Sequence, residues 1–134
     1  MIAALCVDNG GGMLFHNRRQ SQDRLLRADL LREADGRILW MNTYSAGQFV
    51  PPPENLRVAE DFLDRAGPGE LCFLETEDPA PWTERMEGIV LYRWNRKYPA
   101  DLRCTLSLAG WTLARREEFP GYSHETITKE VYTR

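Results

Sequence analysis

The sequence predicts an α/β fold with a mostly parallel central sheet, flanking helices and an antiparallel C-terminal hairpin. In the first half of the chain, short apolar runs alternate with helical segments. Apolar runs that end in turn residues are typical of buried parallel strands. Near the C-terminus two strand-like segments follow one another with only a turn between them. This order favours a parallel sheet that carries an antiparallel edge.

Length and composition indicate a single domain over residues 1–134, with hydrophobic residues at 43% and charged residues at 28%. The formal net charge is −3. We therefore expect no general electrostatic attraction to nucleic acid or to an anionic membrane. The apolar run at residues 2–7 stops at Asp8 and is too short for a signal peptide or a spanning helix.

Cysteine and histidine usage excludes several classes of site. The three cysteines, Cys6, Cys72 and Cys104, are odd in number and widely separated, so they form no disulfide framework and suggest the cytoplasm as the default location. Only His16 and His124 are present. Metallo-hydrolases that need several imidazole ligands are thereby excluded, and no metal site is expected.

The first helix is expected to begin at Ser21, as N-cap, and to end near Ala34, before the glycine signal at Asp35-Gly36. Asp23 then falls in its first turn. At 100° per residue one inward-facing stripe forms, and Leu25, Asp29 and Arg32 lie on the opposite side. The stripe contains Asp23, Leu26, Arg27, Leu30 and Ala34.

The remaining elements follow from apolar runs and turn residues. A short helix is expected at 45–49, ended by Pro51–Pro53, and a helical turn at 83–86. The β-branched alternation before the C-terminus is the clearest strand signal. Strands are expected at 2–7, 37–41, 56–59, 71–75, 89–94, 111–117 and 125–132.

Segments at both ends of the chain, in order, resemble dihydrofolate reductase. IAALCVDNGGGM is similar to the family's first strand and loop, QSQDRLLRADLL to the helix with the acidic motif, and ILWMNTYS to the next strand. Tyr98-Pro99 resembles the family's Phe-Pro, and GWTLARREEF and SHETITKEVYTR resemble its last two strands. The resemblance covers roughly residues 2–49 and 89–134. It implies the family's fold and a reductase-like pocket.

The chain departs from this family where the cofactor would bind. The segment 61–69 is too short for the adenine-binding strand and helix, and Phe73-Leu74-Glu75-Thr76 replaces the paired glycines near the pyrophosphate. Thr43 stands where the family has the Arg that engages the cofactor's extra phosphate. These departures count against NADPH binding in the family's manner and leave the cofactor unassigned.

Asp23 is the first candidate for chemistry. The resemblance implies that it contacts a pterin ring. Its inward position suggests desolvation that raises its pKa, which suits proton transfer or the binding of a cationic amidine-like group. The alternative is a structural Asp at the helix N-terminus, stabilised by the helix dipole and paired with Arg27.

The polar stretch at residues 17–24, just before and within the start of the first helix, is the second candidate site. Arg forks and free backbone N–H groups converge there, as an anion or nucleotide site requires. The alternative is a solvated loop. The residues proposed to bind a ligand are Arg18, Arg19, Gln20 and Gln22, with Arg27 beyond them.

Strand ends supply the other candidates, because open α/β sheets bind ligands at the carboxyl ends of their strands. Asn42, Tyr44 and Ser45 follow one strand, although Ser45 could be only a helix N-cap. Arg93, Asn95 and Arg96 follow another, with Glu75 as an expected partner of one Arg; the alternative is an edge strand protected by charge. His124 is set aside, because Ser123, His124 and Glu125 would alternate across a strand.

Two functions fit these observations. One is a reductase-like enzyme that acts on a pterin-like or other heteroaromatic small molecule, with Asp23 orienting or protonating it. The other is a non-catalytic small-molecule or nucleotide-binding or structural module that kept the fold and lost NADPH binding. A homodimer through a sheet edge or through Pro51–Pro53 is left open by the sequence.

Overall fold

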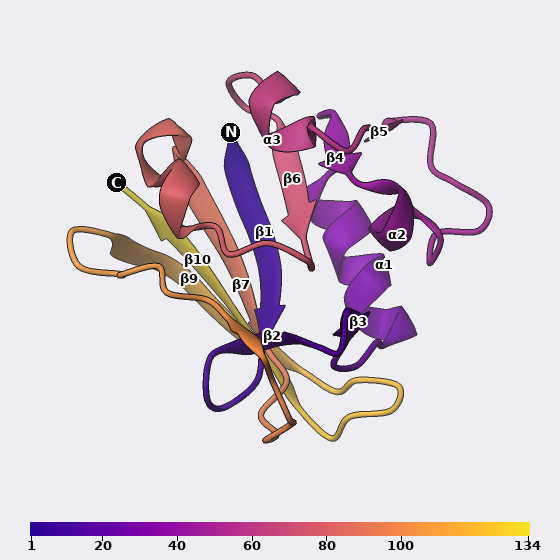
Figure 1. Ribbon diagram of the computed structural model, residues 1–134, viewed down its shortest axis with the longest axis vertical. Helices are drawn as coiled ribbons and strands as arrows, with labels where there is room; N and C mark the ends of the chain where they lie inside the picture. Colours follow the sequence, from indigo (N-terminus) through magenta and orange to yellow (C-terminus); the bar gives the residue numbers. More distant parts are fainter.

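A seven-stranded sheet forms the centre of the computed structural model, which describes residues 1–134 (Figure 1). Its strand order is β5-β4-β6-β1-β7-β10-β9. The first five of these strands run parallel, and β10 pairs antiparallel with both β7 and β9. The predicted fold class is confirmed. The strands are β1 Ile2–Val7, β4 Leu39–Met41, β5 Leu56–Val58, β6 Leu71–Leu74, β7 Gly88–Arg93, β9 Thr112–Phe119 and β10 Ile127–Thr133.

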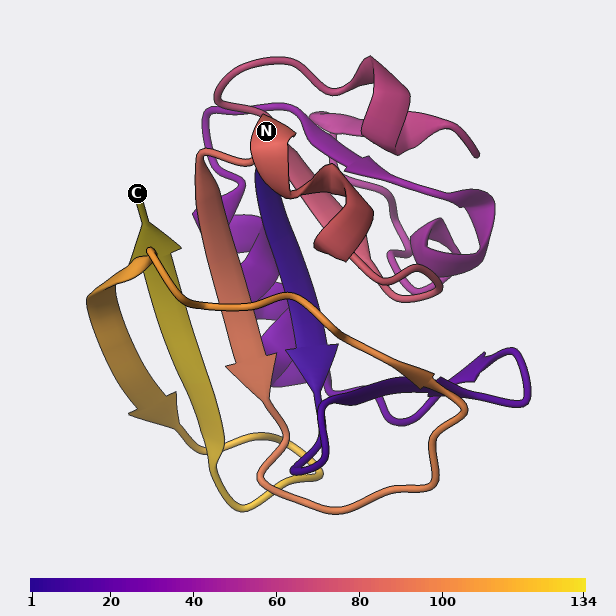
Figure 2. The same ribbon diagram turned by 60° about the vertical axis from the view of Figure 1, so that its left-hand side comes forward.

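Helices lie on both faces of this sheet. The longest, α1 (Arg24–Glu33), covers one face, and η1 (Ala80–Arg85) lies in front of the other in Figure 2. Alternation along β1 divides the core between the two faces. Ala4 packs with Leu26 and Leu30 of α1, whereas Leu5 packs in the cluster that includes Phe62 of α3 (Phe62–Arg65).

A second, three-stranded sheet, not predicted from the sequence, follows the carboxyl end of β1. It has the order β3-β2-β8, with β2 at Gly12–Phe15, β3 at Arg18–Arg19 and β8 at Leu102–Arg103. The β2–β3 hairpin turns through His16 and Asn17, whose φ angles are 51° and 61°. A two-residue hairpin turn with two positive φ angles usually has the sequence Asn-Gly. The His-Asn turn here lacks that signal and joins very short strands, so the sequence does not predict the hairpin.

Both predicted N-caps are wrong. The N-cap of α1 is Asp23, whose carboxylate accepts hydrogen bonds from the backbone N–H groups of Leu25 and Leu26, and Ser21 lies outside the helix. The second helix, α2, spans Thr43–Ala46 rather than 45–49. Asn42 caps it through the Ser45 N–H at 2.9 Å, because an Asx side chain at the strand end reaches the first turn before Ser45 can.

Asp29 is the main exception to the predicted helix faces. It is buried, although the projection placed it outward. Its carboxylate accepts a hydrogen bond from Tyr92 at 2.6 Å and forms an ion pair with Lys129 at 2.8 Å. Lys129 also reaches Glu33 at 2.6 Å. Opposite charges and a phenol therefore hold α1 against β7 and β10 through a residue that was predicted to face outward.

We expect Lys129→Met to lower the free energy of unfolding by about 3 kcal/mol, because removing one member of a buried ion pair leaves the other charge desolvated. Arg32→Ala is the matched control. Arg32 contacts the same Asp29 from an exposed position, and its loss should cost less than about 1 kcal/mol. Urea denaturation of both variants measures the free energy of unfolding. Equal losses in the two variants would show that the buried ion pair stabilises the protein no more than the exposed one.

Candidate functional site

Asp23 is the most heavily engaged polar side chain at the carboxyl end of the sheet. It is 2% exposed. Besides capping α1, its carboxylate accepts backbone N–H bonds from Tyr122 at 3.0 Å and Ser123 at 2.9 Å. Gly121 makes this approach possible, since a Cβ there would lie 2.6 Å from Asp23 Oδ2. The loop before β10 is thus folded around one carboxylate at the start of α1.

The inward position of Asp23 agrees with the prediction, but the expected direction of its pKa is wrong. Burial alone would raise the pKa. The hydrogen bonds from Tyr122, His124, Ser123 and Leu25 outweigh burial and hold the pKa of Asp23 well below its usual range. Hydrogen bonds to the charged form favour ionisation. Asp23 is therefore a fixed anion whose acceptor positions are filled by the protein.

His124 forms a buried hydrogen bond with the Asp23 carboxylate. Its Nδ1 lies 2.9 Å from Asp23 Oδ2, and its ring is buried and stacked on Trp94 with centroids 4.5 Å apart. An ionised carboxylate only accepts hydrogen bonds, so Nδ1 carries the proton that points to it. In the neutral form of the ring, Nε2 is then the nitrogen that can accept a hydrogen bond.

Two hydroxyl groups meet at that acceptor nitrogen. Ser21 Oγ lies 3.0 Å from His124 Nε2, and the Tyr98 hydroxyl lies 3.1 Å from it. Ser21 is half-buried, as is Tyr98. A carboxylate, an imidazole and a hydroxyl therefore stand in one hydrogen-bonded line, assembled from the segment before α1, the loop after β7 and the loop before β10.

Asp8, at the end of β1, holds the adjoining loops in place. One carboxylate oxygen accepts N–H bonds from Gly10 and Gly12, and the other accepts bonds from Tyr98 N–H at 2.9 Å and from Gln20 Nε2 at 3.3 Å. These bonds lower the pKa of Asp8 despite the burial that opposes them. Through Asp8 the first strand fixes the backbone that carries the Tyr98 ring and the side chain of Gln20.

A second polar group joins β3, β6 and α2. Arg19 forms an ion pair with Glu75 at 3.1 Å, and its guanidinium lies 4.2 Å from the centroid of the Tyr44 ring. The Tyr44 hydroxyl accepts the Arg19 backbone N–H, and Gln48 donates to Glu75 at 3.0 Å. Glu75 was expected to pair with Arg93 or Arg96, and that expectation is wrong: β3 brings Arg19 to it first.

The candidates after β7 lie apart from this group. Arg93 forms an ion pair with Glu130 at 2.8 Å, and Asn95 donates to Thr128 Oγ1 at 2.8 Å. Arg96 is exposed, and its carbonyl accepts the Asn9 N–H. These contacts tie β7 to β10 and to the loop after β1, so the structure does not bring this cluster together with Glu75.

The remaining predicted residues have mixed environments. Gln22 is exposed and accepts a hydrogen bond from Arg27, which makes no contact with the Asp23 carboxylate. Asn42 donates to Thr76. Two buried polar atoms have no hydrogen-bond partner, namely Gln20 Oε1 and Ser45 Oγ. Both belong to the set predicted to bind a ligand.

A hollow of about 420 Å³ lies at the predicted site. It combines two guanidinium groups with aromatic rings and a polar amide. The Arg18 side chain is exposed there and makes no hydrogen bond or ion pair, while its backbone pairs with Phe15 in the hairpin. The lining residues are Phe15, His16, Arg18, Arg19, Gln20, Tyr98 and Pro99. Tyr98 connects the hollow to His124.

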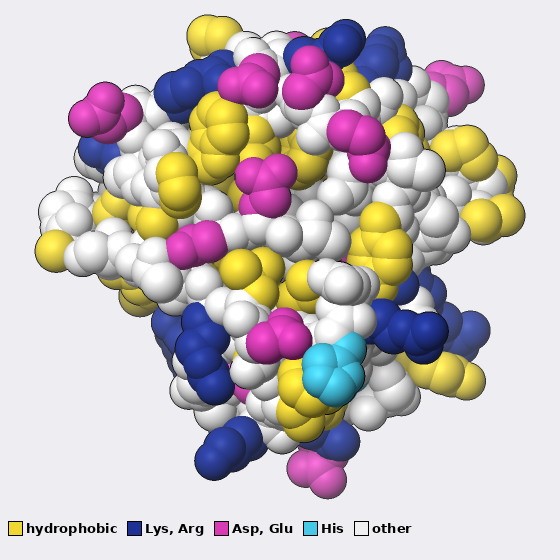
Figure 3. All heavy atoms as spheres, viewed as in Figure 1, with side chains coloured by type: hydrophobic (Ala, Val, Ile, Leu, Met, Phe, Trp, Pro, Cys, Tyr) yellow, Lys and Arg dark blue, Asp and Glu magenta, His cyan; other side chains and the backbone are white.

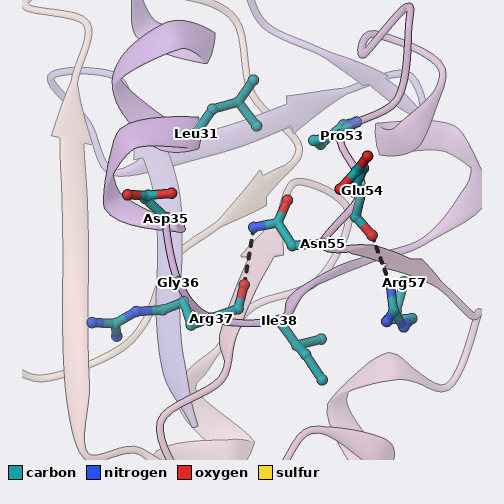
Figure 4. Close-up of a pocket in the computed structure, with 9 residues that line it drawn as sticks. All are labelled: Leu31, Asp35, Gly36, Arg37, Ile38, Pro53, Glu54, Asn55 and Arg57. Carbon is teal, nitrogen blue, oxygen red and sulfur yellow. Dashed lines mark hydrogen bonds between the residues drawn. The ribbon is translucent and has the colours of Figure 1, made fainter.

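A larger hollow, of about 620 Å³, lies at the other end of the sheet, where α1 ends and β4 and β5 begin (Figure 4). Figure 4 shows Asn55 bonded to the Arg37 carbonyl and Arg57 to the Glu54 carbonyl. The Asn55 amide also reaches the Ala34 carbonyl, so these polar groups close the end of α1. Ligands of open α/β sheets bind at the opposite, carboxyl ends of strands.

The surface carries charged side chains of both signs. On the face in Figure 3, acidic and basic side chains are interspersed rather than segregated. No group of three His, Cys, Asp or Glu side chains is arranged to hold a metal ion. No helix has the length and apolar character needed to cross a membrane.

The residues at the end of β6 do not fit a pyrophosphate held as in dihydrofolate reductase. By the sequence resemblance, Glu75 stands where the family has glycines beside the pyrophosphate, and its side chain is only 9% exposed. Its neighbouring cation, Arg19, is already bound to it. A phosphate at this position would meet a carboxylate and no free guanidinium.

Comparison with known proteins supports the architecture. No protein-family model and no curated protein matches the chain. Among solved structures it is similar to the dihydrofolate reductase from Enterococcus faecalis complexed with NADP(H) and RAB-propyl, with a TM-score of 0.73 and 10% sequence identity. The similarity covers 100% of this chain and 96% of that one. It is therefore wider than the two segments in which the sequences resemble each other, and it shows a dihydrofolate reductase-like fold.

We expect Asp23→Asn to cost about 2 kcal/mol of stability at pH 6, because charge-assisted hydrogen bonds are lost. The lowered pKa of Asp23 contributes stability that is fully present above the unfolded value near 4 and declines as the pH falls toward the folded value. The difference between wild type and variant should therefore narrow at pH 3, as measured by chemical denaturation. Asp61→Asn removes only an exposed contact with Arg65 and serves as control. A pH-independent difference for Asp23→Asn would contradict the expectation.

Proposed function

We propose that the protein is a small-molecule enzyme of dihydrofolate reductase-like architecture whose chemistry is proton transfer at His124. The observation that carries this proposal is the line Asp23–His124, with Ser21 and Tyr98 at the second ring nitrogen. A buried carboxylate that fixes the tautomer and orientation of an imidazole is the arrangement used in general acid–base catalysis. Asp23 then acts through His124 rather than on the substrate.

The hollow beside Tyr98 suggests the class of ligand. Rings of Phe15, His16 and Tyr98 offer stacking surfaces, and Arg18 offers a guanidinium without a protein partner. A flat heteroaromatic molecule with a negatively charged substituent suits such a lining. A pterin with a carboxylate side group has this chemistry, as do other heteroaromatic acids.

A non-catalytic binding module is the second candidate. The contacts among Arg19, Glu75, Tyr44 and Gln48 favour it, because they satisfy these polar groups within the protein at the end of β6. A fold that had lost its cofactor would gain stability from such contacts. Turnover of the bound molecule separates the two candidates.

The proposed setting is the cytoplasm. All three cysteines are free, and free thiols fit a reducing compartment. Burial raises the pKa of the Cys72 thiol to about 12. Such a thiol stays protonated and unreactive at neutral pH.

Thermal-shift measurements test the ligand class. At ten times the Kd, a pterin carboxylate should raise the Tm by roughly 5 °C, since a ligand that binds only the folded state stabilises it by about 1.4 kcal/mol. Arg18→Ala should abolish the shift without lowering the Tm of the free protein, and Arg116→Ala on the exposed strand β9 should leave it unchanged. Folate, flavin mononucleotide, nucleotides and NADPH complete the panel.

Three outcomes would count against the proposal. If no compound shifts the Tm, the ligand class is wrong. A shift that survives Arg18→Ala places the site elsewhere. Binding without any change of the ligand, in wild type and in His124→Gln alike, favours the binding module.

A further inference from the structure

We propose that Ser21 is a nucleophile, activated by His124 and Asp23, and that the protein transfers acyl groups from small, negatively charged esters to water. The inference deepens the proposed function, because it rests on His124 as the proton acceptor, adds a covalent step and specifies that the negatively charged ligand is an ester. It starts from the hydroxyl group that approaches the imidazole from outside the buried core.

The three side chains have the mutual distances that such a nucleophile requires. Ser21 Oγ lies 3.0 Å from His124 Nε2, and His124 Nδ1 lies 2.9 Å from Asp23 Oδ2. Nucleophile and base should lie within about 2.6–3.2 Å, with a third group orienting the base. Asp23 is held by four backbone N–H groups and cannot swing away. The imidazole is fixed further by its stacking on Trp94.

Backbone donors stand next to the hydroxyl. The N–H groups of Ser21 and Gln22 make no hydrogen bond within the protein, and both precede the N-terminus of α1. In acyl transfer the N–H of the residue after the nucleophile commonly binds the developing oxyanion. Gln22 occupies that position in the chain. The helix dipole adds to the stabilisation of negative charge there.

The substrate class follows from the neighbouring hollow. Gln20 and Tyr98 line it, and Tyr98 shares His124 Nε2 with Ser21. Arg18 supplies a free positive charge at its rim. An ester whose acyl part ends in a carboxylate would place the anion near Arg18 and its carbonyl carbon near Ser21.

Besides the ester, water is the only reactant that the reaction needs. The bond from Ser21 Oγ to the carbonyl carbon forms while the hydroxyl proton moves to His124 Nε2. The bond from that carbon to the alcohol oxygen then breaks, and the alcohol leaves with the proton from His124. Water adds to the acyl group with the same nitrogen as base, and the acid departs as the Ser21 hydroxyl is restored.

Labelling with a fluorophosphonate tests the nucleophile directly. Intact-mass and peptide analysis should find one adduct, on Ser21. It should be absent in Ser21→Ala, and the labelling rate should fall at least tenfold in His124→Gln. Ser107→Ala, which changes an exposed serine far along the chain, should label as wild type does. Tyr98→Phe should keep the label, because the phenol is not the base. Circular dichroism confirms that each variant is folded.

Ester hydrolysis tests the substrate class. The 4-nitrophenyl monoester of succinate should be cleaved faster than 4-nitrophenyl acetate, and Arg18→Ala should remove that preference. A label on another residue, or cleavage that is unchanged in Ser21→Ala, overturns the nucleophile. If Ser21→Ala keeps the activity and His124→Gln loses it, the covalent step is wrong while proton transfer at His124 stands. If both variants behave as wild type, both proposals fail.

Discussion

The Asp23 carboxylate is the constraint on which the carboxyl end of the sheet depends. It ends the loop from β3, begins α1 and binds the backbone of the loop before β10. A buried carboxylate is costly unless its oxygens are fully hydrogen-bonded. These contacts meet that requirement, and they fix His124 at the same time. Stability and site geometry therefore have one origin here, because the bonds that keep the anion buried also orient the imidazole.

The fold places this carboxylate at the carboxyl end of the sheet, the end where open α/β sheets bind ligands. The contacts around it restrict what the neighbouring groups can do. Asp23 faces inward, but hydrogen-bond donors of the protein occupy the acceptor positions of its carboxylate. At the end of β6, Glu75 is bound in an ion pair with Arg19. A shared architecture fixes where strands end and not which atoms are free there. The group best placed for proton transfer is His124 Nε2, which contacts the Ser21 and Tyr98 hydroxyls.

Local patterns made much of the fold predictable. Apolar runs located β1, β6 and β7, and β-branched alternation located β10, each within two residues at its ends. The errors are at places where distant contacts override local preference. Asp29 was placed outward by helical periodicity, but Lys129 and Tyr92 from the sheet draw it inward. Ser21 and Ser45 are good N-caps by residue type, and Asp23 and Asn42 took that role because their carboxylate and amide reach the first turn directly.

By itself the sequence determined the α/β class, the order along the chain of the strands of the seven-stranded sheet, and the inward position of Asp23, because each depends on the spacing of residues within one segment. Only the tertiary structure decided what Asp23 contacts. His124 lies 101 residues away along the chain, and as part of a local triplet with Ser123 and Glu125 it had been set aside. Long-range pairing depends on how loops close over the sheet, and no local period encodes it. The inward Asp23 is thus a property of the sequence, and its orientation of His124 is a property of the fold.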